Sequence, residues 1–269
     1  MLIPIHDANA LRHITRPIVT RGLIAVNILI WLAMYPDAWA SFANRLVVQL
    51  GFIPALVTHQ AMLPADLQLV PPEATFVTYA FLHGSFTHIG INMLFLWIFG
   101  DNVEDALGHG RFLLFYLICA AAGAGLHLLF YSQPEAPLIG ASGAISGVVI
   151  AYAILHPHVR LWVLVFFGIP VPLPAFIPLA FWIGQQFFEL VTGYGDSVSF
   201  AAHVGGIIAG GLLVLVLRRP GVPLFGRDVA GRREAPEAPV PVTPWRRIEN
   251  GRRSGPGNDQ DPNPPRWGR

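Results

Sequence analysis

The stretch that decides the fold is GASGAISG at residues 140–147, where Ser142 lies among residues too small to cover its hydroxyl and between two strongly apolar segments. Of the 269 residues in the chain, 54% are hydrophobic and only 12% are charged, and the mean hydropathy is +0.53. Soluble domains carry roughly 25% charged residues. The composition therefore indicates a membrane protein, in which a run of small residues lets two helices approach closely.

Six apolar stretches, separated by charged or Pro/Gly-rich breaks, approach the ~20 residues that a membrane-spanning helix needs. They are residues 18–35, 85–103, 112–131, 141–155, 174–191 and 201–217. The sequence thus predicts an all-α membrane protein, a six-helix bundle with a long first extracytoplasmic loop at residues 36–73. The apolar part of that loop, residues 46–57, is too short and too broken to span, and we expect it at the membrane interface. The short fourth stretch is expected to begin below the membrane surface, in a cavity lined by protein.

The arginines predict the orientation, because the chain contains no lysine and loops rich in Arg remain in the cytoplasm. The predicted cytoplasmic side carries Arg12, Arg16, Arg21, Arg111, Arg160 and the arginines from Arg218 onward, whereas the opposite loops carry only Arg45. We therefore expect a multi-pass protein of the inner cell membrane with both termini in the cytoplasm. Its expected parts are a cytoplasmic N-terminal segment (1–17), the helical domain (18–219) and a disordered Pro/Arg-rich tail (220–269) that contacts anionic lipid head groups. A formal net charge of +1 gives no indication of a nucleic-acid partner.

Polar residues occur in the outer parts of three predicted spans, and polar residues inside a membrane are candidates for function by default. Ser142 begins the fourth span, and His203, in AAHVGGIIAGG (201–211), begins the sixth. His88 and Asn92 lie in the outer half of the second span, four residues apart and hence on one helix face. All three spans descend from the outer side, so the sequence predicts that these four side chains meet at a similar depth.

Glycines make a close approach of the fourth and sixth spans possible, because their small-xxx-small spacing permits tight helix contact. They are Gly140, Gly143 and Gly147 around the serine, and Gly206 and Gly210 after the histidine. Such glycines, like a lone serine or histidine, are common in membrane helices for structural reasons alone. The agreement in depth and helix direction favours a functional site in which Ser142 lies against His203.

The residue types suit nucleophilic catalysis on a carbonyl group. A neutral imidazole can take the proton of the Ser142 hydroxyl during the attack. The oxyanion that forms needs donors already in position, and the Asn92 amide, the His88 ring and a backbone N–H at the start of a helix can supply them. The acidic residues of the second span, within 101–105, lie at its opposite end. The sequence therefore predicts a Ser–His dyad without a carboxylate.

Four segments, in this order, resemble those of the rhomboid family of intramembrane serine proteases, of the bacterial six-span type. They are HGSFTHIGIN (83–92), GDNVEDALGHGRF (100–112), GASGAISG (140–147) and AAHVGGIIAGG (201–211), and the resemblance covers about residues 18–217. It implies an enzyme that cleaves transmembrane segments of membrane-protein substrates in the lipid bilayer without a cofactor. It also implies that Ser142 is the nucleophile, His203 the base, and His88, Asn92 and the Ser142 backbone N–H the oxyanion donors.

The resemblance further implies that Glu104 has a structural role and that the fifth span, with the loop after it, gates the lateral access of substrates. Two positions depart from the family pattern. Some members have, four residues after the nucleophile, an aromatic residue that stacks on the catalytic histidine, where this chain has Ser146. Many have a Trp-Arg pair in the first loop, where this chain has Asn44-Arg45. We therefore expect the imidazole to be held differently here.

Two other functions are compatible with a multi-pass membrane protein. A catalytically inactive rhomboid-like protein that binds membrane clients would retain the fold, although the presence of both Ser142 and His203 argues against it. A small-solute transporter would show an internal duplication, which is not visible in this sequence.

The remaining histidines show no metal-ligand spacing, so no metal is expected, and His83 could help to hold the first loop. Cys119, the only cysteine, is expected to be a packed or lipid-facing thiol. The prolines at 170, 172, 174 and 178 predict a loop followed by a kinked helix start.

Overall fold

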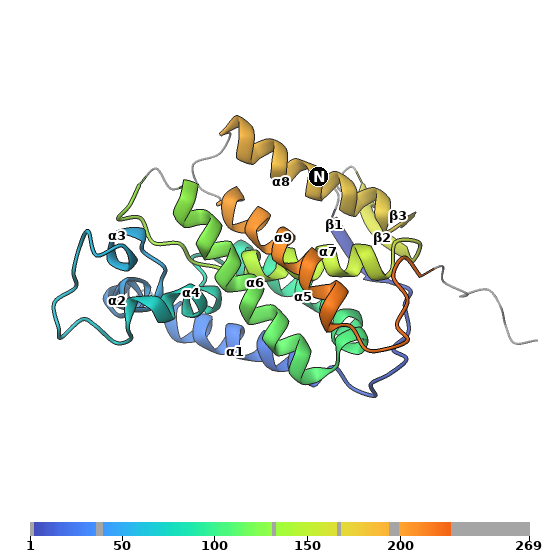
Figure 1. The fold of residues 1–269 in the computed structure, drawn as a ribbon, viewed down its shortest axis with the longest axis horizontal. Coiled ribbons are helices and arrows are strands. Elements are labelled where there is room, and N and C mark those ends of the chain that lie inside the picture. Colours follow the sequence, from blue (N-terminus) through green and yellow to red (C-terminus); the bar gives the residue numbers. More distant parts are fainter. Residues whose placement is uncertain (1–2, 36–39, 131–132, 166–167, 194–198, 227–269) are drawn as a thin grey trace, which may run out of the picture. The chain divides into compact units, whose positions relative to one another are not determined.

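The computed structural model describes residues 3–35, 40–130, 133–165, 168–193 and 199–226 (Figure 1). These residues belong to the first of two units into which the chain divides, residues 1–228. Most of the predicted tail, residues 227–269, lies outside the described residues. Its first part is packed on the helices, because the N–H groups of Phe225 and Gly226 donate to the carbonyls of Ile154 and Leu155 at 2.8 and 3.2 Å.

All six predicted spans form helices, with ends within a few residues of the prediction. They are α1 (Ile18–Met34), α5 (Phe86–Leu107), α6 (His109–Phe130), α7 (Ser142–Leu155), α8 (Phe176–Thr192) and α9 (Phe200–Leu217). Within the described residues, α6 and α9 are long and apolar enough to cross a membrane, and α5 qualifies together with the segment before it, Pro72–Phe81, from which it is bent by 84°. Helices α1 and α7 are apolar but shorter. A mostly helical membrane fold is confirmed, while the number of six spans stays a prediction.

The first loop folds into short elements. They are α2 (Ala40–Leu50), α3 (Pro54–Val57), η2 (Pro72–Ala74), α4 (Thr75–Thr78) and η3 (Tyr79–Phe81). Gly51 and Pro54 separate α2 from α3, so the apolar residues 46–57 form two short helices in place of one. Proline is favoured at the first position of a helix, where its missing N–H breaks no bond. Helices α2, α3 and α4 gather at one end of the bundle, opposite the strands (Figure 1).

A three-stranded antiparallel sheet makes the all-α prediction incomplete. The strands β1 (Ile3–Asp7), β2 (Arg160–Val165) and β3 (Ile169–Pro174) pair in the order β1-β2-β3. The predicted loop was therefore wrong for Pro170, Pro172 and Pro174, which alternate along β3. Alternate residues of a strand direct their N–H groups to the same side, and β3 is an edge strand, so all three missing N–H groups can face away from β2. Pro178 lies in the first turn of α8, where a missing N–H is also tolerated.

Carboxylates at the C-terminal end of α5 hold the N-terminal segment. Glu104 is fully buried and accepts hydrogen bonds from the backbone N–H groups of Val19 and Thr20 at 3.0 and 2.7 Å, and from the Thr20 hydroxyl at 2.6 Å. These N–H groups lie in the first turn of α1, where a helix has no internal acceptor for them. Asp105 accepts three further backbone N–H groups, from residues 12–14. Glu104 thus stabilises the start of α1, which is a structural role.

Small residues let α6 pack tightly against both α7 and α9. A Cβ atom added at Gly123 would lie 2.8 Å from the carbonyl oxygen of Ala202 and 3.4 Å from the Cα of Gly143. Cys119, one turn earlier on α6, is fully buried, and its sulfur lies against Gly147. The thiol is therefore packed between helices and does not face lipid.

Candidate active site

The N-terminal halves of α7 and α9 lie side by side because glycines take the place of larger side chains between them. A Cβ atom added at Gly206 would lie only 1.8 Å from the carbonyl oxygen of Gly143, and one added at Gly210 would lie 2.5 Å from the backbone of Gly147. Real Cβ atoms essentially never approach another heavy atom to less than 3.0 Å. Residue numbers rise together along the two helices, so α7 and α9 run parallel. A Cβ atom added at Gly143 would lie 3.3 Å from the carbonyl oxygen of Ala202, so the first turns, which carry the predicted nucleophile and base, are neighbours.

Ser142 is the first residue of α7 and is half-buried. The chain reaches it through Gly140, which has a φ of +119°, a conformation that residues with a side chain rarely adopt. The Gly140 N–H donates to the carbonyl of Tyr79 at 3.0 Å, which ties this loop to η3. Because Ser142 begins the helix, its backbone N–H has no acceptor inside α7.

The ring of His88 lies directly against the loop that precedes Ser142. A Cβ atom added at Gly140 would be 2.5 Å from the His88 Nε2 atom. Asn92 is buried one turn further along α5, and its Nδ2 donates to the carbonyl of His88 at 2.9 Å. An amide nitrogen carries two hydrogens, so a second one remains for another acceptor. The structure therefore brings His88 beside this loop, with Asn92 on the same face of α5.

His83 has a larger structural role than sequence reasoning assigned to it. Its ring is 2% exposed and lies 5.0 Å from the ring of His88, and its Nε2 accepts a long hydrogen bond, 3.5 Å, from the Ala141 N–H. The other ring nitrogen, Nδ1, is buried and has no hydrogen-bond partner within the described ranges. His83 thus supports the loop immediately before Ser142, a contact that its spacing from His88 does not reveal.

The imidazole of His203 is held from α8. Its Nδ1 lies 2.7 Å from the Oε1 of Gln186, a side chain that is only 4% exposed. Its ring centroid lies 6.3 Å from that of Trp182, also on α8, and 6.1 Å from that of Phe200. Sequence reasoning did not single out Gln186, although a polar side chain inside an apolar span is itself a signal of function.

The departure from the family pattern at Ser146 fits this arrangement. Ser146 is buried, and its Oγ donates to the carbonyl of Ser142 at 2.7 Å, within α7. A serine there reaches its own helix and offers no ring to stack on an imidazole. The rings nearest to His203 come from Trp182 and Phe200 instead.

The predicted nucleophile and base lie on adjacent helices without a direct hydrogen bond. Among the described residues, no hydrogen bond joins the Ser142 hydroxyl to the His203 imidazole, whose Nδ1 is engaged by Gln186. In the same ranges, no group of three His, Cys, Asp or Glu side chains is placed to hold a metal ion. The chemistry that this arrangement can support is proton transfer and nucleophilic attack by the side chains themselves.

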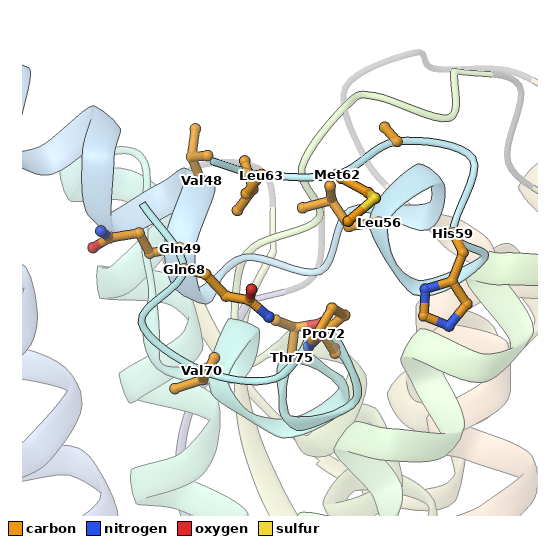
Figure 2. Close-up of a pocket in the computed structure, with 11 residues that line it drawn as sticks. Val48, Gln49, Leu56, His59, Met62, Leu63, Gln68, Val70, Pro72 and Thr75 are labelled. Atoms are coloured by element: carbon orange, nitrogen blue, oxygen red, sulfur yellow. The ribbon is translucent and has the colours of Figure 1, made fainter. Parts of the chain in front are cut away.

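A cavity of about 220 Å³ lies in the first loop, away from these residues (Figure 2). Its lining is mostly apolar and comes from α2, α3 and the chain that follows up to α4, with His59 and Gln68 among the polar exceptions. None of the predicted site residues lines it. The candidate active site is thus defined by the contacts among α5, α7, α8 and α9.

Comparison with known proteins identifies the family. The Rhomboid domain family matches residues 73–220, more than half of the chain. "Rhomboid protein 1, mitochondrial" of Saccharomyces cerevisiae is 28% identical over 195 residues, which cover 70% of this chain and 50% of that protein. The chain therefore belongs to the rhomboid family, and the resemblance found in the sequence is confirmed.

Two bacterial relatives are named as proteases. Rhomboid protease GluP of Bacillus subtilis is 32% identical over 147 residues, which cover 54% of this chain and 26% of that protein. Rhomboid protease GlpG of Photorhabdus laumondii is 29% identical over 140 residues, with coverages of 52% and 46%. The matched part spans half or less of the length of each of these three relatives.

Proposed function

We propose that the protein is an intramembrane serine endopeptidase that cleaves transmembrane segments of membrane proteins with a Ser142–His203 dyad. The observation that carries the proposal is the close backbone approach of α7 and α9 at Gly143, Ala202 and Gly206, which supports a site formed by the first turns of these two helices. The names of the two bacterial relatives agree with it. The distribution of arginines supports an inner-membrane protein with both termini in the cytoplasm.

In the proposed reaction, His203 takes the proton of the Ser142 hydroxyl as the oxygen attacks the scissile carbonyl carbon. The C–N bond breaks when the imidazolium gives that proton to the leaving amine, and an acyl-enzyme remains. Water then attacks the ester carbonyl while His203 takes its proton. Collapse of the second intermediate releases the carboxylic acid product and returns the proton to Ser142.

Three donors are proposed for the oxyanion that develops in both steps. They are the backbone N–H of Ser142, the N–H of Asn92 that does not bond to the α5 backbone, and a ring N–H of His88. Donors that are fixed before the reaction stabilise the developing charge without reorganisation. The positive end of the α7 dipole acts in the same direction. The small residues around Ser142 leave room for the substrate backbone beside these donors.

A catalytically inactive rhomboid that binds membrane clients is the alternative function. The missing hydrogen bond between Ser142 and His203 fits that alternative. It fits an enzyme equally, because catalytic hydrogen bonds are often long without substrate and shorten in the complex. The presence of both side chains on adjoining turns favours the enzyme.

Labelling by a fluorophosphonate and cleavage of a model transmembrane substrate in liposomes test the proposal. We expect Ser142→Ala and His203→Ala each to abolish cleavage with little change in melting temperature, because they remove reactive groups and little packing volume. The double variant should lose no more than either single one, since the two residues act as a unit. Cleavage by Ser142→Ala would contradict the dyad. A folded wild-type protein that binds substrate but neither cleaves it nor reacts with the probe would support the client-binding alternative.

A further inference from the structure

The contacts of Gln186 determine which nitrogen of His203 carries a hydrogen. The amide Nε2 of Gln186 donates to the backbone carbonyl of Trp182 at 3.0 Å, one turn earlier on α8. The amide Oε1 lies 2.7 Å from the His203 Nδ1. The side chain is 4% exposed, so little water competes for either contact.

The orientation of this amide follows from the carbonyl of Trp182. A carbonyl oxygen only accepts hydrogen bonds, so the NH₂ group of Gln186 must face it, and the amide oxygen must face the imidazole. The amide oxygen also only accepts, so the His203 Nδ1 must be the nitrogen that carries the hydrogen. A neutral imidazole has one N–H, and its Nε2 therefore keeps a free lone pair.

We propose that Gln186 is a positioning residue that holds His203 in the Nδ1–H tautomer, so that Nε2 is free to take the proton of Ser142. The inference rests on the proposed function and deepens it. In serine hydrolases with a triad, a carboxylate bound to the imidazole fixes the same tautomer and ring orientation. Here a neutral amide does so, and the rings of Trp182 and Phe200 pack near the imidazole. Because Gln186 and Trp182 both lie on α8, the orientation of the base depends on the position of that helix.

The acceptor-free variant Gln186→Met tests this inference in the full-length protein in liposomes. Methionine has a similar length and no amide oxygen, so the imidazole can rotate or change tautomer. We expect kcat for a transmembrane substrate and the rate of fluorophosphonate labelling to fall together by at least about tenfold, since a wrong tautomer in a triad costs up to 10⁴-fold. KM and melting temperature should change little. Gln185→Met is the matched control, because Gln185 is the exposed neighbour on the same helix.

A second variant, Gln186→Glu, separates positioning from structure. A carboxylate still accepts from Nδ1–H, so most of the activity should return. Its charge also stabilises the imidazolium, so the acidic limb of the pH–rate profile should move to higher pH. A purely structural role would give neither result. If Gln186→Met fails to fold, Gln186→Leu and the pH profile of Gln186→Glu decide the question in its place.

Nitrogen-15 NMR of labelled histidine tests the tautomer without any activity measurement. The wild-type His203 should show a protonated Nδ1 and an unprotonated Nε2 at neutral pH, and Gln186→Met should lose this preference. An unchanged tautomer, or an unchanged kcat and pH profile in Gln186→Met, would overturn the inference. If the wild type neither cleaves nor labels, the proposed function fails. The NMR result alone then decides whether Gln186 sets the tautomer.

Discussion

Replacing Gly206 by alanine tests whether backbone contact between α7 and α9 builds the site. The new Cβ atom would lie 1.8 Å from the carbonyl oxygen of Gly143 and 2.8 Å from its carbonyl carbon. To restore a separation of 3.0 Å, the two helices must move apart by at least 3.0 − 1.8 = 1.2 Å at this point. The obstacle is backbone, so no rotation of a side chain can relieve the clash.

The expected losses follow from this displacement. Inserting a methyl group into a well-packed interior costs about 1–3 kcal/mol when the surroundings must shift, and we expect the upper part of this range for a backbone clash. The same displacement separates the turns that carry Ser142 and His203. A misplacement of about 1 Å between reacting groups can lower a rate by roughly 10². Stability and kcat should therefore fall together in Gly206→Ala.

Gly211→Ala is the matched control on the same helix. The nearest atoms to a Cβ added there are side-chain carbons of Ile150 and Ile154 at 3.7 and 4.0 Å, which is ordinary contact. Both variants replace glycine by alanine in a helix interior, so the gain in helix propensity is shared. Thermal unfolding in detergent and turnover of a transmembrane substrate should separate them, with Gly211→Ala equal to wild type or slightly more stable. Wild-type stability and turnover in Gly206→Ala would refute the contact, and lost turnover at unchanged stability would refute the packing explanation.

Two further predictions concern the proposed oxyanion donors and the N-terminal sheet. Asn92→Ala should lower kcat by on the order of 10²–10³ at an unchanged melting temperature, because one preorganised donor is lost, while Ser142 should still react with a fluorophosphonate, more slowly. Burial raises the pKa of Asp7 above its ordinary value of 3.8, although hydrogen bonds from Tyr152 and Asn102 lower it in part. When an acid has a higher pKa in the folded than in the unfolded state, the folded protein loses stability as the pH rises above the pKa of the unfolded state. The melting temperature of Asp7→Asn should therefore rise relative to that of wild type as the pH increases from 3.8 through the raised folded-state pKa of Asp7, and a difference that does not change with pH would contradict the shift.

The helices could be predicted because their signal is local. A run of apolar residues of sufficient length has few alternatives in a membrane, and Ser85 and Ser199 mark two helix starts by accepting N–H groups three residues later. The strands could not be predicted because their pairing is not local. The partner of 160–165 on one side is β1, more than 150 residues earlier in the chain, and prolines at every second position look like a loop until they are placed on an edge strand.

Local sequence patterns indicate only part of the candidate site. Glycine spacing along α7 and α9 is visible in the sequence, and it is what allows the two first turns to meet. The contact of His83 with the Ala141 N–H joins residues 58 positions apart. The contact of Gln186 with His203 depends on how α8 is rotated about its axis, which no spacing within 174–191 specifies. Such contacts between helices need the three-dimensional arrangement.

The choice of an amide as the partner of His203 has a physical reason in a membrane protein. A carboxylate is more costly than an amide to bury at this depth beside a neutral imidazole, because its charge is then not neutralised. A neutral amide oxygen fixes the same tautomer without adding charge to the unreacted site. The disadvantage of the amide appears only in the transition state, because it stabilises the imidazolium more weakly than a carboxylate would. We therefore expect the oxyanion donors to supply a larger share of the rate enhancement here than in a site with a carboxylate. Comparing Asn92→Ala with Gln186→Met tests whether the oxyanion donors contribute more than the positioning of the base. If they do, Asn92→Ala should lose more activity than Gln186→Met.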